Sequence, residues 1–180
     1  MGHPENSSVG PGAVAQLCPQ CALCCNGVLF KDVELQPGDD GAKLRALGLP
    51  ISKARFAKFP QPCAALEGCT CRIYADRPAR CRDFDCALLQ SVGAGKTEAE
   101  AALRIIRRTR ARAEKVRRLF RELGDADESV ALSLRFRRTR RRLESLQLDD
   151  DTAEIFGQLT LAVHDLNLAL RQHFYPAATD

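Results

Sequence analysis

The residues best suited to chemistry in this sequence are four cysteines within eight positions, Cys18, Cys21, Cys24 and Cys25. Each C-x-x-C step lets two thiolates converge on one tetrahedral metal ion, and the two steps here share Cys21. A disulfide between Cys24 and Cys25 is disfavoured, because neighbouring side chains diverge. The spacing therefore predicts metal binding.

A second group of cysteines begins about 40 residues downstream. Its members are Cys63, Cys69, Cys71, Cys81 and Cys86, which brings the candidate metal ligands to nine. Eight thiolates suffice for two four-cysteine zinc sites, or for one four-iron cluster with spare thiols. On a continuous helix, residues five apart point about 140° away from each other. Cys81 and Cys86 can therefore bind one ion only if the helix breaks between them; otherwise they serve different sites.

The two groups together resemble the YkgJ-like cysteine-cluster family, whose members are described as zinc- or iron-chelating proteins. The similarity rests on C-x-x-C-x-x-C-C at 18–25, on Pro62-Cys63, and on C-x-I-Y-x-x-R-P-x-x-C-R-x-F-x-C at 71–86. It covers roughly residues 17–92, and Cys69 fits the pattern least closely. The resemblance implies a chelating site built from cysteines.

The N-terminus and the apolar content bear on the compartment. Residues 1–16 lack a charged start followed by an apolar stretch, so no signal peptide is expected. No run approaches the roughly 18 apolar residues that span a bilayer. Clustered thiols in a reducing cytosol hold metal more often than they form disulfides. We therefore expect a cytoplasmic protein without a membrane segment.

The first half of the chain is predicted to be irregular. Residues 1–16 have the composition of a disordered leader, and residues 17–92 form a cysteine-rich module without a long apolar face. Within the module we expect an extended stretch at 28–35, a short helix at 42–47 and a longer helix at 76–90. Bound metal would then stabilise a module that has little core of its own.

Residues 93–180 are predicted to form a three-helix antiparallel bundle, so the fold class is mainly α. Apolar residues at helical spacing predict helices at 97–123, 127–147 and 152–174. A capping box from Thr97 to Glu100 should start the first helix. The side chains expected in its core are Ile106, Phe120, Phe136, Leu143, Leu159 and Leu166.

Charge is distributed unevenly along the chain. Residues 96–147 hold 16 basic and 8 acidic side chains, whereas residues 148–180 hold 1 and 6. The run Arg135 to Arg142 is either a solvated helix face or a grip for nucleic-acid phosphates. The arginines of the second cysteine group either offset thiolate charge or pair with nearby aspartates. These arginines are Arg72, Arg77, Arg80 and Arg82, and the aspartates are Asp76, Asp83 and Asp85.

These observations predict a metal-chelating protein that binds zinc through cysteine thiolates in a structural or accessory role. The first alternative is an iron–sulfur enzyme or its accessory, because C-x-x-C-x-x-C-C also looks like the pattern of flagellin lysine methylases. The second is a zinc-scaffolded nucleic-acid binder that contacts RNA, or another acidic partner, through 135–142. The sequence assigns no catalytic residue, and it names no partner or substrate.

Overall fold

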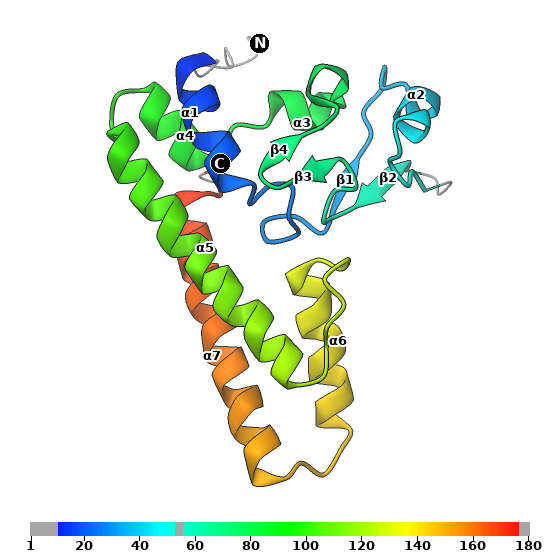
Figure 1. Ribbon diagram of the computed structural model, residues 1–180, viewed down its shortest axis with the longest axis vertical. Coiled ribbons are helices and arrows are strands. Elements are labelled where there is room, and N and C mark those ends of the chain that lie inside the picture. The colour runs from blue at the N-terminus through cyan, green and yellow to red at the C-terminus, as the bar shows by residue number, and fades with distance from the viewer. Residues whose placement is uncertain (1–10, 53–55, 177–180) are drawn as a thin grey trace, which may run out of the picture.

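The computed structural model describes residues 11–52 and 56–176, and its elements follow one another without long connections (Figure 1). The described helices are α1 (Pro11–Cys21), α2 (Gly41–Ala46), α3 (Ala79–Asp83), α4 (Ala87–Gly93), α5 (Ala99–Glu122), α6 (Leu132–Glu144) and α7 (Asp150–His173), with a 3-10 turn at Tyr74–Asp76. The strands β1 (Asp32–Glu34) and β2 (Lys58–Pro60) form one antiparallel pair, and β3 (Leu66–Glu67) and β4 (Thr70–Cys71) form another. The mainly α class predicted from the sequence is confirmed.

The long helices α5 and α7 lie antiparallel along most of their length (Figure 1). Helix α5 ends at Glu122, and Gly124 just beyond it adopts a φ of +76°, which is typical of a residue that follows a helix. Helix α6 then runs in the same direction as α5, because the 125–131 connection first runs back along α5 toward its start. Two contacts fix this direction: the Leu132 amide donates to the Gly27 carbonyl at 2.9 Å, while Arg142 donates to the Leu123 carbonyl. Helix α7 therefore runs antiparallel to both α5 and α6.

Two separate apolar cores divide the chain, and they do not follow the predicted boundary at residue 92. The larger core joins α5, α6 and α7 to residues that precede them, including Leu17, Leu23 and Leu29. Leu88 and Leu89 of α4 also belong to it. We call this part, residues 11–29 and 86–176, the helical body. The cysteine-rich half therefore contributes directly to the core that the long helices share.

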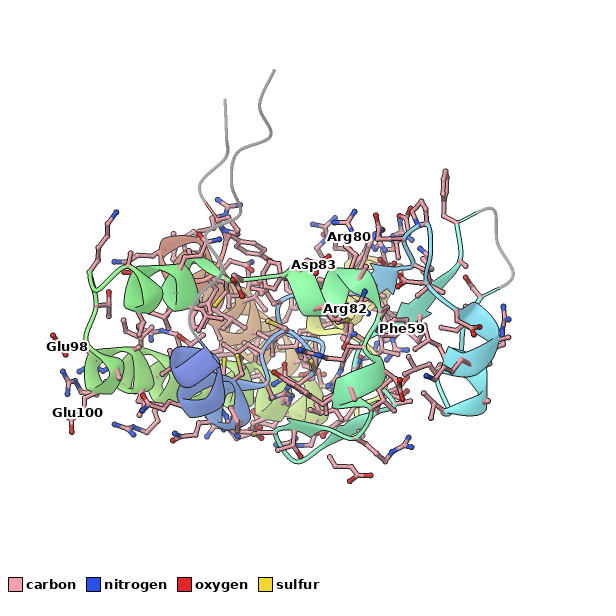
Figure 2. The ribbon with its side chains drawn as sticks, turned by 90° about the horizontal axis from the view of Figure 1, so that it is seen from above. Phe59, Arg80, Arg82, Asp83, Glu98 and Glu100 are labelled. Atoms are coloured by element: carbon pink, nitrogen blue, oxygen red, sulfur yellow. The ribbon has the colours of Figure 1, made fainter. Side chains whose placement is uncertain are left out.

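The smaller core lies within residues 32–81, which we call the inner lobe. Its buried side chains are Leu44, Leu49, Ile51, Phe59, Ala65 and Ile73. Figure 2 shows Phe59 toward the side that carries α2, and Glu98 and Glu100 at the opposite end, where α5 begins. The inner lobe thus has an apolar centre that was not predicted, because its members come from short elements without a shared periodicity.

Several local predictions differ from the structure. Residues 11–16 were expected in a disordered leader, but they lie in α1, which starts at Pro11, a residue well suited to a first turn; residues 1–10 lie outside the described ranges. The helix predicted at 76–90 is two helices, because residues 84–86 are extended between them. The capping box at Thr97 does not form: α5 starts at Ala99, and the Thr97 hydroxyl lies 2.6 Å from that of Ser91.

The predicted bundle core is confirmed at five of its six positions. Ile106, Phe120, Leu143, Leu159 and Leu166 are buried. Phe136 is half-buried and packs at the edge of the larger core, because the inward position one residue earlier on α6 belongs to Arg135.

The burial of Arg135 corrects the interpretation of the arginine run as a uniform outward face. Its side chain is fully buried, with its guanidinium 4.5 Å from the Phe120 ring centroid and its Nε 3.3 Å from Asp125 Oδ1. Arg138 donates to both oxygens of Asp125, at 2.9 and 3.0 Å. With Arg142 bound to the end of α5, half of the run's six arginines hold α6 in place.

Candidate metal centre

The nine cysteines all lie in the described ranges, and each is a free thiol. Cys18 and Cys21 are on the last turns of α1, which ends at Cys21 and is followed by Ala22, a non-glycine residue with a φ of +56°. This conformation reverses the chain, and the amides of Cys25 and Asn26 both donate to the Ala22 carbonyl at 2.9 Å. The turn brings the last two cysteines of the motif back beside the first two.

One set of four neighbouring thiols consists of Cys18, Cys21, Cys24 and Cys86. Burial raises the pKa of Cys18 to about 11 and that of Cys21 to about 12, and it also raises the pKa of Cys24 well above its ordinary value. In each case the nearby Cys86 thiol adds to the rise. Cys86 is the residue before α4, and α4 packs against α1. We call these four cysteines the body set, because Cys21, Cys24 and Cys86 pack with the larger core.

A second set consists of Cys25, Cys63, Cys71 and Cys81. Burial raises the pKa of Cys25 and of Cys81 to about 12, and in both cases the thiols of Cys63 and Cys71 contribute. The Cys63 amide also donates to the Cys25 carbonyl at 2.8 Å, which joins the two loops directly. Cys63, Cys71 and Cys81 pack against the smaller core. We call these four cysteines the lobe set.

The adjacent residues Cys24 and Cys25 are assigned to different sets by the thiols that raise their pKa most, Cys86 and Cys21 for Cys24 but Cys63, Cys81 and Cys71 for Cys25; smaller contributions run between the sets, from Cys25 to Cys24 and from Cys18 to Cys25. The same is true of Cys81 and Cys86, which lie on opposite sides of the break between α3 and α4. The helix does break between Cys81 and Cys86, which is one of the two conditions that the sequence left open for this pair. Their neighbouring thiols also differ: Cys86 acts on Cys18, Cys21 and Cys24, whereas Cys63 and Cys71 act on Cys81. Each set combines one part of the C-x-x-C-x-x-C-C motif with cysteines from the second group.

Only some of the arginines that the sequence suggested act on the thiols. Arg77 lowers the pKa of Cys18 and of Cys81, so its charge acts on both sets. Arg72 acts in the same way on Cys63. Arg110 of α5, which no motif marked, acts on Cys21 and donates to the Gln20 carbonyl at 2.7 Å.

Among the residues that the structure describes, none of the predicted aspartates forms an ion pair with these arginines. Asp76 binds Lys43 at 2.7 Å, and Arg72 pairs with Glu67 at 3.3 Å. Figure 2 shows Arg80, Arg82 and Asp83 together on α3. The charge of Asp85 adds to the raised pKa of Cys18 and of Cys86.

The ninth cysteine, Cys69, stands apart. It follows Gly68, which has a φ of +60°, in the turn that connects β3 to β4. It is not among the principal charged neighbours of the raised thiols in either set. In the described ranges, no three cysteine, histidine, aspartate or glutamate side chains already surround a common point as metal ligands. The two sets are neighbouring thiols whose side chains must still converge on an ion.

The donor chemistry fits a metal ion in both sets. Four sulfur atoms without a histidine or carboxylate match the tetrahedral thiolate sites of zinc and the ligation of iron–sulfur clusters. Each set lies where backbone from different parts of the chain meets, which is typical of structural metal sites.

Residues 17–108 match a family described as "CxxCxxCC: Putative zinc- or iron-chelating domain". The match covers half of the chain, and the protein belongs to this family. No curated protein is significantly similar to the chain, and no solved structure is either. None of the described helices combines the length and apolar character needed to cross a membrane.

Proposed function

We propose that this protein binds two metal ions, one in the body set and one in the lobe set, each through four cysteine thiolates. The observation that supports this best is the division of eight cysteines into two groups of four neighbours, which coincides with the division of the apolar cores. Membership of a zinc- or iron-chelating family supports metal binding as such.

Zinc is the metal that we propose. Bacterial ferredoxins bind iron–sulfur clusters with a C-x-x-C-x-x-C-x-x-x-C run followed by proline. Here the third and fourth cysteines are adjacent, and Asn26 follows them. A doublet whose thiols serve two sets suits two single ions, because one tetrahedral zinc needs only four sulfur atoms about 2.3 Å away.

The proposed role of the metals is to hold the fold together. In the lobe set, zinc would link Cys25 at the exit from the helical body to Cys81 on α3 and to the hairpin cysteine Cys71. Structural zinc contributes on the order of 10–16 kcal/mol of apparent binding free energy per site. A small lobe whose described part buries six apolar residues depends on such a contribution.

The test is the metal content of three single variants, each purified without oxygen. Wild-type protein should contain two zinc ions per chain and should be colourless. Cys63→Ser should lose the zinc of the lobe set, and Cys21→Ser should lose the zinc of the body set. Each variant should retain one zinc. Cys69→Ser is the matched control, because it removes a thiol outside both sets, and it should retain both ions.

Limited proteolysis separates the two sites further. Cys63→Ser should expose residues 32–81 to cleavage while α5 and α7 remain protected. Cys21→Ser should leave the inner lobe resistant. Loss of a metal from Cys69→Ser, or the same cleavage pattern in both site variants, would contradict the division. A brown protein with acid-labile sulfide would show that the cysteines hold iron–sulfur clusters rather than zinc, and it would favour a redox or enzymatic function.

A further inference from the structure

The outward face of α5 carries a continuous strip of basic side chains. Arg104, Arg107, Arg108, Lys115 and Arg118 are all exposed on this helix. At 100° per residue they lie on one side, opposite the buried Ile106, Ala113 and Phe120. From Arg104 to Arg118 the strip extends about 21 Å along the helix axis. We call these five residues the α5 strip.

The centre of the α5 strip is not neutralised by the protein itself. Arg104 pairs with Glu100 at 3.6 Å and Arg118 with Glu122 at 3.4 Å, so the two ends are partly compensated. In the described part of the chain, Arg107, Arg108 and Lys115 have no carboxylate within 4.0 Å.

The carboxylate on the same stretch of helix is already engaged. Glu114 is exposed, but it lies 3.7 Å from Arg117 and 2.9 Å from Arg121 and pairs with these two arginines rather than with the strip. The three central cations therefore face solvent with their charge available.

A polar groove of about 300 Å³ borders the strip on the side of the cysteine motif. Its lining residues are Leu23, Asn26, Arg110, Ala111, Ala113, Glu114 and Arg117. The two groove arginines are held in position by the motif loop: Arg110 donates to Gln20, and Arg117 donates to the Asn26 carbonyl at 3.3 Å. The positive surface thus continues from the exposed strip into a concave edge.

We propose that the α5 strip binds the phosphate backbone of a nucleic acid without reading its sequence. The large exposed apolar side chains of the described residues lie on other elements: Phe56, Tyr74, Leu146, Leu161, Leu168 and Tyr175. The strip therefore lacks the apolar anchors of a membrane-bound helix and the aromatic platform that stacks bases. Spaced cations alone match a polymer with regularly spaced single negative charges, and such binding is independent of sequence.

This inference does not depend on which metal the cysteines hold. It also differs from the sequence expectation for 135–142, because the structure uses Arg135, Arg138 and Arg142 to hold α6. In the described part of the chain, the three central cations of the α5 strip have no carboxylate partner, while the opposite face of α5 packs in the larger core.

The experiment measures fluorescence anisotropy of metal-loaded, full-length protein with a labelled 20-base-pair DNA duplex, a 20-nucleotide RNA of mixed sequence, and polyglutamate of similar charge. The strip variant is the triple change Arg107→Gln, Arg108→Gln and Lys115→Gln. The control is Lys31→Gln, Arg45→Gln and Lys96→Gln, which removes three exposed cations away from the centre of the strip. Both variants change the net charge equally, so their comparison separates local contacts from overall charge.

Wild type should bind the nucleic acids, and affinity should fall as salt rises. The strip variant should bind at least tenfold more weakly at about 0.1 M salt, with a log–log salt slope flatter by about 2–3, since each lost phosphate contact removes roughly 0.7–0.9. The control variant should bind as wild type does. Three results would overturn the proposal: no binding at about 50 mM salt, equal losses in both variants, or equal affinity for polyglutamate, which would indicate an acidic protein as the partner.

Discussion

The buried pair of Asp125 and Arg135 offers the sharpest test of how α6 is held. Asp125 is only 7% exposed, and its carboxylate receives Arg138 at 2.9 and 3.0 Å and faces Arg135 Nε at 3.3 Å. Arg135 is fully buried and also donates to the Asp125 carbonyl. Removing the carboxylate therefore leaves a guanidinium in an apolar site without its counter-charge.

We expect Asp125→Ala to lower the free energy of unfolding by about 3–5 kcal/mol, the usual cost of breaking a buried ion pair from one side. Arg135→Met should cost less, by about 2 kcal/mol, because methionine can pack on Phe120 while Asp125 keeps its bidentate contact with Arg138. The double variant should lose less free energy of unfolding than the sum of the two single losses, since replacing Arg135 removes the buried charge that Asp125→Ala leaves unpaired. We expect a coupling free energy of about 2 kcal/mol.

Urea denaturation of the metal-loaded proteins, followed by far-ultraviolet circular dichroism, gives the three free energies. Metal content is measured on the same samples, so that a loss of zinc is not mistaken for a loss of packing. Asp125→Asn serves as the isosteric control, because it keeps the shape and removes only the charge. A cost below about 1 kcal/mol for Asp125→Ala, or strictly additive losses, would refute the argument that burial makes this pair interdependent.

Three further predictions concern other parts of the fold. Gly27→Ala should cost at least about 1–2 kcal/mol and weaken zinc binding in the lobe set, because φ is +76° and a Cβ would lie 3.0 Å from Pro62 Cδ and 3.1 Å from Ala131 Cα; unchanged thermal stability and zinc content would contradict this. Leu166→Ala should cost about 2–5 kcal/mol in urea unfolding, since Leu166 is buried in the larger core, and a loss below about 0.5 kcal/mol would show that its site is not tightly packed. Asp149 accepts a hydrogen bond from the Thr152 amide, which lowers the pKa of this carboxyl below its ordinary value. The stabilisation of the fold by ionised Asp149 is therefore present above the ordinary pKa of the carboxyl, and it is lost as the pH falls through the lowered pKa. Thermal melts should show Asp149→Ala less stable than wild type at about pH 7 and equal to it in strong acid, whereas an equal difference at both pH values would exclude a role for the charge.

The sequence predicted the long helices well because their signal is periodic and local. The apolar stripe of Ile106, Phe120, Leu159 and Leu166 repeats at helical spacing, and all four side chains are buried. The third helix, predicted at 152–174, is observed as α7 at Asp150–His173. The start of α5 was wrong because Thr97 is drawn into a contact with Ser91, which depends on where α4 ends.

The candidate metal ligands could be named from sequence, but their grouping could not. Spacing shows that Cys24 and Cys25 are candidates; it does not show that Cys24 packs against the larger core while Cys25 has the lobe cysteines Cys63, Cys71 and Cys81 as its neighbours. That separation depends on Leu23, which is fully buried, and on the Cys25 to Cys63 backbone contact between loops far apart in the chain. The role of Arg135 was also out of reach, because an arginine within a basic run gives no local sign that it is buried.

The insertion of the inner lobe between two neighbouring points of the helical body has a consequence for folding kinetics. The chain leaves the body after Leu29 and returns to it by Cys86, and next to these two points the rings of Phe30 and Phe84 lie 5.0 Å apart. If the lobe opens while the body stays folded, its two ends remain tethered side by side. Because its ends are already held together, the lobe refolds without the entropy cost of closing a loop. It can therefore open and re-form as a local cooperative unit without disturbing α5 or α7.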